Sequence, residues 1–174
     1  MNGEKARDYY PFNHKGLVLA DGDVAVLDCR GSHLCGYVAL PNDSIPKEWR
    51  GNYAADALQY LNIHGGITYC DAHEEDTVFG FDCAHSGDDE NPLLKDPEHV
   101  KQLVLQMKAQ LLAYAAVIDE WRAADRETRI KMVDEIAHSG SYEGAPGMGF
   151  MLGLLSGRPE FGEGATQEEA TEDK

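Results

Sequence analysis

An apolar pattern with the period of an α-helix runs from Asp96 to Trp121, and it constrains the fold more than any other feature of the chain. Asp96, Pro97 and Glu98 are typical of a helix start, because an aspartate cap accepts a bond from a free amide and proline has no amide to satisfy. Apolar residues then recur every three or four positions over about seven turns. They are Val100, Leu103, Val104, Met107, Leu111, Ala115, Ile118 and Trp121. One face of this helix must therefore be covered by another part of the chain.

Segments predicted to be extended precede this helix, and we expect the sheet that they form to pack against its apolar face. The predicted elements are a hairpin at residues 16–28, strands at 33–41, 63–70 and 77–85, and a second, shorter helix at roughly 126–137. A loop at 42–52 is anchored by Trp49. Because the strands precede the helices and do not alternate with them, the pattern favours an α+β fold. We expect a small antiparallel β-sheet packed against one long amphipathic helix plus a second shorter helix.

The chain divides into one domain and a tail. Residues 1–159 are interpreted as a single α+β domain, and residues 160–174 as an acidic disordered tail without periodicity. The Gly-rich apolar segment at 148–155 and the Trp121 end of the long helix favour self-association as a homo-oligomer.

Charge limits the classes of partner. The 174 residues contain 15 Lys and Arg against 31 Asp and Glu, a net charge of -16, which disfavours direct nucleic-acid binding and anionic membranes. No apolar run is long enough to span a bilayer and the first residues are too polar for a secretory signal, so a cytoplasmic location is predicted. Eight of the acids lie between Asp71 and Glu90 without a Lys or Arg, and we expect them to form a solvated rim. The four cysteines are expected to be reduced.

Strand alternation suggests a candidate site between residues 63–70 and 77–85. An antiparallel register can place His64 opposite Asp82, Gly66 opposite Gly80 and Thr68 opposite Val78. Facing glycines would leave a shallow groove beside a His–Asp pair, which suits a polar ligand, a metal ion or general-base chemistry. The alternative is that the two polar side chains only satisfy one another.

Metal-type residues allow three further interpretations. A divalent ion with open coordination positions, the candidate cofactor, could use His64, Asp82, His85 and Asp88. A zinc quartet from Cys70, His73, Cys83 and His85 is disfavoured, because its members lie at opposite ends of the predicted strands. A weaker cluster consists of Cys29, His33 and Cys35. No nucleophile elbow, P-loop or GxGxxG turn is evident, so no catalytic residue is assigned.

Two segments, His64-Gly65-Gly66-Ile67-Thr68-Tyr69 and Gly80-Phe81-Asp82-Cys83-Ala84-His85-Ser86-Gly87-Asp88, carry a resemblance. Over roughly residues 34–115 the chain resembles small tailed-phage and prophage proteins with an HGGLTY-like segment, a GFDCAHAGD-like segment and a following helix. The resemblance implies a phage accessory protein in the host bacterial cytosol, without implying a reaction. It marks as functional positions His64, Gly65, Gly66, Asp82, Cys83, His85 and Asp88.

Three functions follow as hypotheses. The first is a phage-encoded protein that counteracts host processes or defence by binding a small polar, nucleotide-like ligand or a host protein. Its ligand-binding residues would be the seven functional positions together with Thr68. The second is a metal-dependent hydrolase that uses the His/Asp site. The third is an acidic decoy that presents the carboxylates of residues 71–90 to a host protein that binds nucleic acid.

Overall fold

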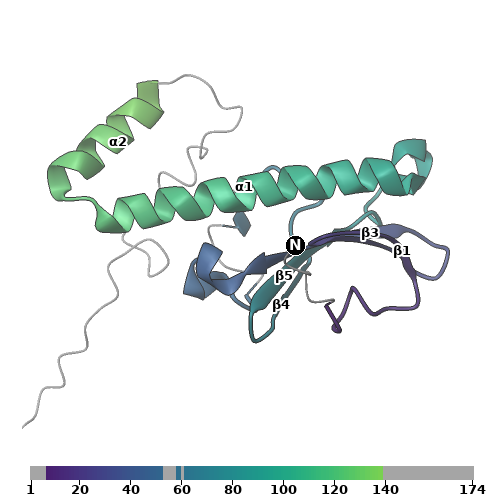
Figure 1. Ribbon diagram of the computed structural model, residues 1–174. Coiled ribbons are helices and arrows are strands. Elements are labelled where there is room, and N and C mark those ends of the chain that lie inside the picture. The colour runs from purple at the N-terminus through teal and green to yellow at the C-terminus, as the bar shows by residue number, and fades with distance from the viewer. Residues whose placement is uncertain (1–6, 53–57, 60, 139–174) are drawn as a thin grey trace, which may run out of the picture.

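The computed structural model describes residues 7–52, 58–59 and 61–138 (Figure 1). Five antiparallel strands form one sheet in the order β1-β2-β3-β5-β4. They are β1 (Leu17–Asp21), β2 (Val24–Asp28), β3 (Leu34–Pro41), β4 (Tyr69–Ala72) and β5 (Asp76–Asp82). The α+β prediction is confirmed. The predicted tail, the segment at 148–155 and residues 53–57 and 60 lie outside the described residues.

The helix α1 (Pro97–Ala123) covers one face of the sheet (Figure 1). The side chain of Asp96 caps it by accepting a hydrogen bond from the amide of Glu98 at 3.0 Å, as predicted. Its residues Val104, Met107 and Leu111 are fully buried. A Cβ at Gly36 in β3 would lie 2.5 Å from a methyl group of Val104, so this glycine lets the helix approach the sheet. None of the described helices is long and apolar enough to cross a membrane.

Shorter helices complete the described elements. The second helix α2 (Arg126–His138) begins where it was predicted. Trp121, expected to offer apolar surface for self-association, is only 8% exposed, and the guanidinium of Arg129 lies 5.6 Å from its ring centre. Among the described residues, the 3-10 helices in the connections include η1 (Asn42–Ser44), η2 (Lys47–Trp49), η4 (Asp88–Glu90) and η5 (Pro92–Lys95). Trp49 is fully buried, which confirms that it anchors its loop.

The opposite face of the sheet is covered by the N-terminal segment, which the sequence analysis did not foresee. Tyr9, Tyr10 and Phe12 pack against a second buried cluster that includes Leu27 and Tyr37. The hydroxyls of Tyr10 and Tyr37 lie 2.7 Å apart. The central strands β2, β3 and β5 are therefore buried on both faces, whereas β1 and β4 are partly exposed.

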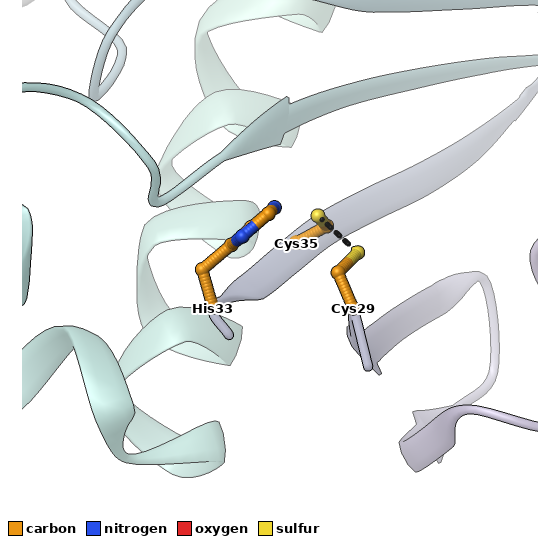
Figure 2. Close-up of side chains that lie close together, drawn as sticks. All are labelled: Cys29, His33 and Cys35. Atoms are coloured by element: carbon orange, nitrogen blue, oxygen red, sulfur yellow. Dashed lines mark hydrogen bonds between the residues drawn. The ribbon is translucent and has the colours of Figure 1, made fainter. Parts of the chain in front are cut away.

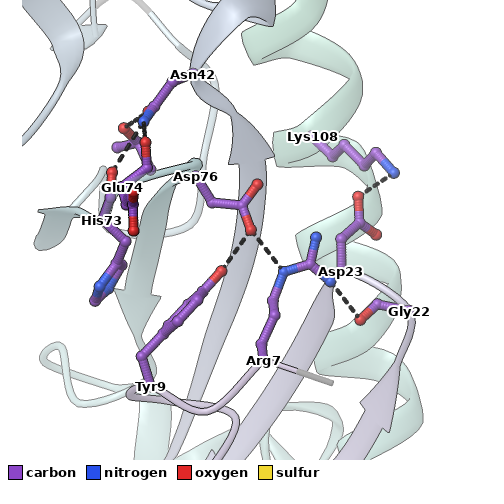
Figure 3. A network of polar contacts seen from close by, with 10 residues as sticks. Arg7, Tyr9, Gly22, Asp23, Asn42, His73, Glu74, Asp76 and Lys108 are labelled. Carbon is purple, nitrogen blue, oxygen red and sulfur yellow. Dashed lines mark hydrogen bonds and ion pairs between the residues drawn. The ribbon is translucent and has the colours of Figure 1, made fainter. Parts of the chain in front are cut away.

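One end of the sheet, which we call the turn end, is held by a polar network (Figure 3). It comprises the turn at residues 22–23, the end of β3 and the start of β5. The carboxylate of Asp76 accepts hydrogen bonds from Arg7 Nε at 2.9 Å and from the hydroxyl of Tyr9 at 2.6 Å. Lys108 of α1 pairs with Asp23 at 2.5 Å. Each of these carboxylates thus has a cation or a hydroxyl donor.

The predicted register of β4 against β5 is wrong by three residues. Tyr69, not Gly66, pairs with Gly80. The segment before Tyr69, which was predicted to be a strand, has a turn at His64 and Gly65 and no regular structure at residues 66–68. Gly65 and Gly66 have φ values of +65° and +80°, which strands do not use. The backbone conformation of these two consecutive glycines is therefore incompatible with the strand that was predicted over residues 63–68.

Candidate functional site

The segments 64–69 and 80–88, which carry the resemblance to phage proteins, meet at the opposite end of the sheet. We call this end the cluster end. It comprises the connection from β2 to β3 at residues 28–34 and the segment 82–88 that follows β5. The turn carrying His64 and Gly65 packs against this segment: Nε2 of His64 lies 2.9 Å from Oδ2 of Asp88. His64 and Asp88 are 24 residues apart in the sequence, and their side chains are in direct contact.

His64, His85 and Asp88 offer three ligand atoms that lie within 4.8 Å of one another. Nδ1 of His85 lies 3.4 Å from Oδ2 of Asp88, and the His85 amide donates a 2.8 Å hydrogen bond to the same oxygen. The side chain of Asp88 is 10% exposed, and those of His64 and His85 are 25% and 39% exposed. The group therefore has a buried carboxylate at its base and an imidazole that reaches solvent.

Gly65 makes this approach possible. A Cβ built on Gly65 would overlap the imidazole of His85, and its φ of +65° is also unfavourable for a side chain. Gly66 has a similar backbone conformation, but a Cβ there would meet nothing within 4 Å. Gly65 thus sets the position of His85, whereas Gly66 serves the turn.

The electrostatics of Asp88 favour the ionised carboxylate. Burial by itself raises the pKa of Asp88, but the hydrogen bonds from His64 and from the His85 amide outweigh it, so the pKa is lowered. An ionised carboxylate between two imidazoles has the chemistry of a divalent-metal site. Ligands about 2.1 Å from a metal in neighbouring octahedral positions lie about 3 Å apart, close to the 2.9 and 3.4 Å distances at Asp88.

A pocket of about 380 Å³ opens beside this group. His85 and Asp88 line it together with the only lysine or arginine in its described lining, Lys95. The β2–β3 connection contributes Ser32 and His33. This volume is within the range of small-molecule sites. The pocket therefore joins residues from three separate parts of the chain.

Not all of the predicted ligand residues join the group. Asp82 is not opposite His64: it pairs with Cys35, and its carboxylate lies 3.9 Å from Nδ1 of His85. Thr68 is exposed, and its amide bonds to the carbonyl of Gly80. Gly66 and Gly80 do not face each other, so the predicted glycine floor is wrong.

Gly80 has another role. A Cβ at this position would overlap the ring of Tyr37, which packs across it on the face covered by the N-terminal segment. Gly80 is a small residue beneath an aromatic ring, a common reason for glycine inside a strand. It belongs to the core and not to a ligand groove.

The thiols near the core do not provide a nucleophile. Cys83 lines the pocket but is 5% exposed, and burial, reinforced by Asp88 and Asp82, raises its pKa to about 12. Burial also raises the pKa of Cys70 to about 11. Both thiols are therefore protonated at neutral pH, and the thiolate is the reactive form.

The disfavoured zinc quartet does not form among the described residues. Cys70 donates to the carbonyl of Trp49 at 3.2 Å, and His73 stacks on Tyr9 with a ring-centre separation of 3.9 Å. Within the described residues, two sets of side chains could supply three ligands to one metal ion. One consists of His64, His85 and Asp88, which we call the His64 group, and the other of Cys29, His33 and Cys35.

Lys95 and Ser32 line the pocket although no sequence pattern predicts it. Lys95 ends η5, and Ser32 lies in the β2–β3 connection, far from either motif in the sequence. Neither position has a local pattern that marks it, because only the packing of η5 and of this connection around residues 83–89 brings them to the pocket.

Comparison with protein-family models, with curated proteins and with solved structures found no match.

Proposed function

We propose that the protein binds a divalent metal ion through His64, His85 and Asp88 and uses the open coordination positions to hold a small anionic ligand in the adjoining pocket. The observation that carries the proposal is the convergence of the three ligand atoms within 4.8 Å at the edge of that pocket. Two imidazoles and one carboxylate on one side of a metal leave its other positions free.

Charge explains why a metal ion would be needed. The chain carries a net charge of -16, and Asp88 and Asp89 line the pocket against a single lysine, Lys95. A phosphate or carboxylate ligand needs local positive charge to enter such surroundings. A bound divalent ion beside Lys95 would supply it. A nucleotide-like ligand, as in the first of the three functional hypotheses, would then meet local positive charge in the pocket.

In this proposal the biological role is that of a phage accessory protein which binds a small polar molecule of the host. The acidic-decoy alternative is less favoured, because several carboxylates of residues 71–90 are engaged within the molecule. Asp76 bonds to Arg7 and Tyr9, and Asp88 bonds to His64. Of the eight acids in this segment, these two are therefore committed to contacts within the molecule.

The first test measures metal binding alone. Mn²⁺ is a hard ion that prefers nitrogen and oxygen ligands over thiolates, and binding removes the electron paramagnetic resonance signal of the free ion. We expect one Mn²⁺ per chain, with at least tenfold weaker binding in Asp88→Asn and His85→Ala. Asp89→Asn is the matched control, because Asp89 lines the same pocket outside the three-ligand group. Equal Mn²⁺ affinity in Asp88→Asn and Asp89→Asn would contradict the proposal.

The second test adds a ligand and separates binding from hydrolysis. AMP is the probe, and its affinity is measured by calorimetry with and without Mn²⁺. We expect binding only with the metal, and weaker binding in Lys95→Ala. Release of inorganic phosphate during the same incubation would assign the metal-dependent hydrolase instead, in which a metal-bound water attacks the phosphoester. AMP binding that ignores Mn²⁺ would contradict the role given to the metal.

A further inference from the structure

A second ligand group, separate from the His64 group, lies on the β2–β3 connection. Cys29, His33 and Cys35 offer two sulfurs and one imidazole nitrogen, all within 4.8 Å of one another. Figure 2 shows the two sulfurs facing each other and the His33 ring directed toward the sulfur of Cys35. Cys29 and His33 are half-buried, and Cys35 is 4% exposed.

The local backbone explains why these side chains converge. β2 and β3 pair in a register that places Leu27 opposite Cys35, and the amide of Cys29 bonds to the carbonyl of His33 at 2.9 Å. Continuing this register puts Cys29 opposite His33, so all three ligands stand on one face of the hairpin. The reversal itself uses positive φ values at Arg30 and Gly31.

Hydrogen bonds hold this connection in place. The carboxylate of Asp28 accepts a 2.5 Å bond from the amide of Gly31, and the hydroxyl of Ser32 donates to the carbonyl of Cys29 at 2.8 Å. The Ser32 hydroxyl also lies 2.7 Å from Nδ1 of His33. A bond at Nδ1 fixes the ring and leaves Nε2 available as a ligand, which is the usual outer-shell arrangement of a metal-binding histidine.

The two sulfurs are 2.8 Å apart, and both cysteines are free thiols. Two thiolates on one tetrahedral zinc ion, each about 2.3 Å from it, lie about 3.8 Å apart. An opening of about 1 Å, within reach of a side-chain rotation at the half-buried Cys29, would accommodate the ion. Asp82 adds negative charge beside the group, because it pairs directly with Cys35 across β3 and β5.

We propose that Cys29, His33 and Cys35 bind a zinc ion, with a solvent-derived ligand in the fourth position. Binding converts the two thiols into zinc-bound thiolates and releases two protons to solvent, without oxidation or reduction. The zinc proposal does not rest on the function proposed for His64, His85 and Asp88: the two groups share no ligand residue, although His33 also lines the pocket beside the first group.

The experiment uses the full chain, reduced and freed of metal, and titrates it with Co²⁺ as a spectroscopic substitute for zinc. Thiolate-to-cobalt charge transfer absorbs in the near ultraviolet, whereas a site of imidazoles and a carboxylate gives no such band. We expect this band to saturate at one thiolate-bound Co²⁺ per chain, irrespective of Co²⁺ bound by His64, His85 and Asp88, and to disappear when Zn²⁺ is added. A reduced chain that shows no band would overturn the zinc proposal whatever the result of the Mn²⁺ test.

Variants locate the site. Cys29→Ser and His33→Ala should each weaken Co²⁺ binding at least tenfold, and far-ultraviolet circular dichroism checks that each variant folds. Cys70→Ser is the matched control, because Cys70 is a partly buried free thiol outside the group of three ligands and its replacement should leave the band intact. A band that persists in Cys29→Ser, or one that is lost in Cys70→Ser, would overturn the proposal. So would a protein that forms a Cys29–Cys35 disulfide and shows no thiolate band with Co²⁺ after that disulfide is reduced.

Discussion

At the turn end of the sheet, the carboxylate of Asp76 is held by Arg7 and Tyr9, whereas at the cluster end the carboxylate of Asp88 faces two imidazoles. Both carboxylates are largely buried, with 15% and 10% of their side chains exposed. Arginine is always charged and is bound to Asp76 as a permanent partner. An imidazole can instead give up its proton and bind a metal. The same kind of buried acid therefore stabilises the fold at one end and remains available for a ligand at the other.

The largest expected effect is a loss of stability when the polar network at the turn end is disrupted. Asp76→Ala removes the partner of Arg7 and of the Tyr9 hydroxyl, and we expect the free energy of unfolding to fall by about 2–3 kcal/mol. Urea denaturation measures this change. Glu75→Ala is the matched control, because the side chain of Glu75 is exposed and should tolerate replacement. Mn²⁺ binding should be unchanged in both variants. A loss of Mn²⁺ affinity in Asp76→Ala would show that the two ends are not independent.

The next effect distinguishes Gly65 from Gly66, the two glycines of the turn that packs against the cluster end. Gly65→Ala should destabilise the chain by about 1–2 kcal/mol, because the new side chain needs a left-handed backbone and overlaps His85. Displacing His85 should also weaken Mn²⁺ binding at least tenfold. Gly66→Ala has a similar backbone cost, about 1 kcal/mol, but should retain Mn²⁺ affinity, since its side chain would meet nothing. Equal Mn²⁺ affinities in the two variants would show that Gly65 does not position His85.

The smallest effect is the pH dependence that Asp88 gives to stability when no metal is bound. The pKa of Asp88 is lowered in the folded chain, so below its ordinary value of about 3.9 the unfolded chain binds more protons than the folded one. The stabilising contribution is complete above that value and is lost as the pH falls through the folded pKa. Urea midpoints measured in EDTA should therefore fall less between pH 6 and about pH 3 in Asp88→Asn than in the unchanged chain. Asp89→Asn should behave like the unchanged chain, and an identical acid loss in all three would contradict this assignment.

Local sequence signals predicted most of the fold. The Asp96 cap, the apolar face of α1 and the hairpin around residues 21–22 all depend on neighbours within a few positions, and each is confirmed. The sequence did not indicate that Tyr9 and Tyr10 cover the second face of the sheet. Aromatic residues in a polar terminal segment have no period, and only the apolar surface of the folded sheet gives them a place to bind.

The sequence predicts three residues of the candidate site, but the strand pairing from which it does so is wrong. His64, His85 and Asp88 were all named from the sequence, but the expected partner of His64 was Asp82 across a ladder. Alternation assumed that residues 63–68 are extended, and the positive φ values at Gly65 and Gly66 remove that assumption. The turn then delivers His64 to the loop after β5 instead of to the strand itself.

The sequence by itself determined the classes of element, the acidic surface and the residue types available for a site. These properties follow from composition and from side-chain periodicity, which each residue carries wherever the chain places it. Only the tertiary structure decided which histidine meets which carboxylate and that Lys95 joins the same pocket. Such contacts depend on backbone turns and on packing between segments far apart in the chain, and a one-residue change of register moves every side chain of a strand to the other face.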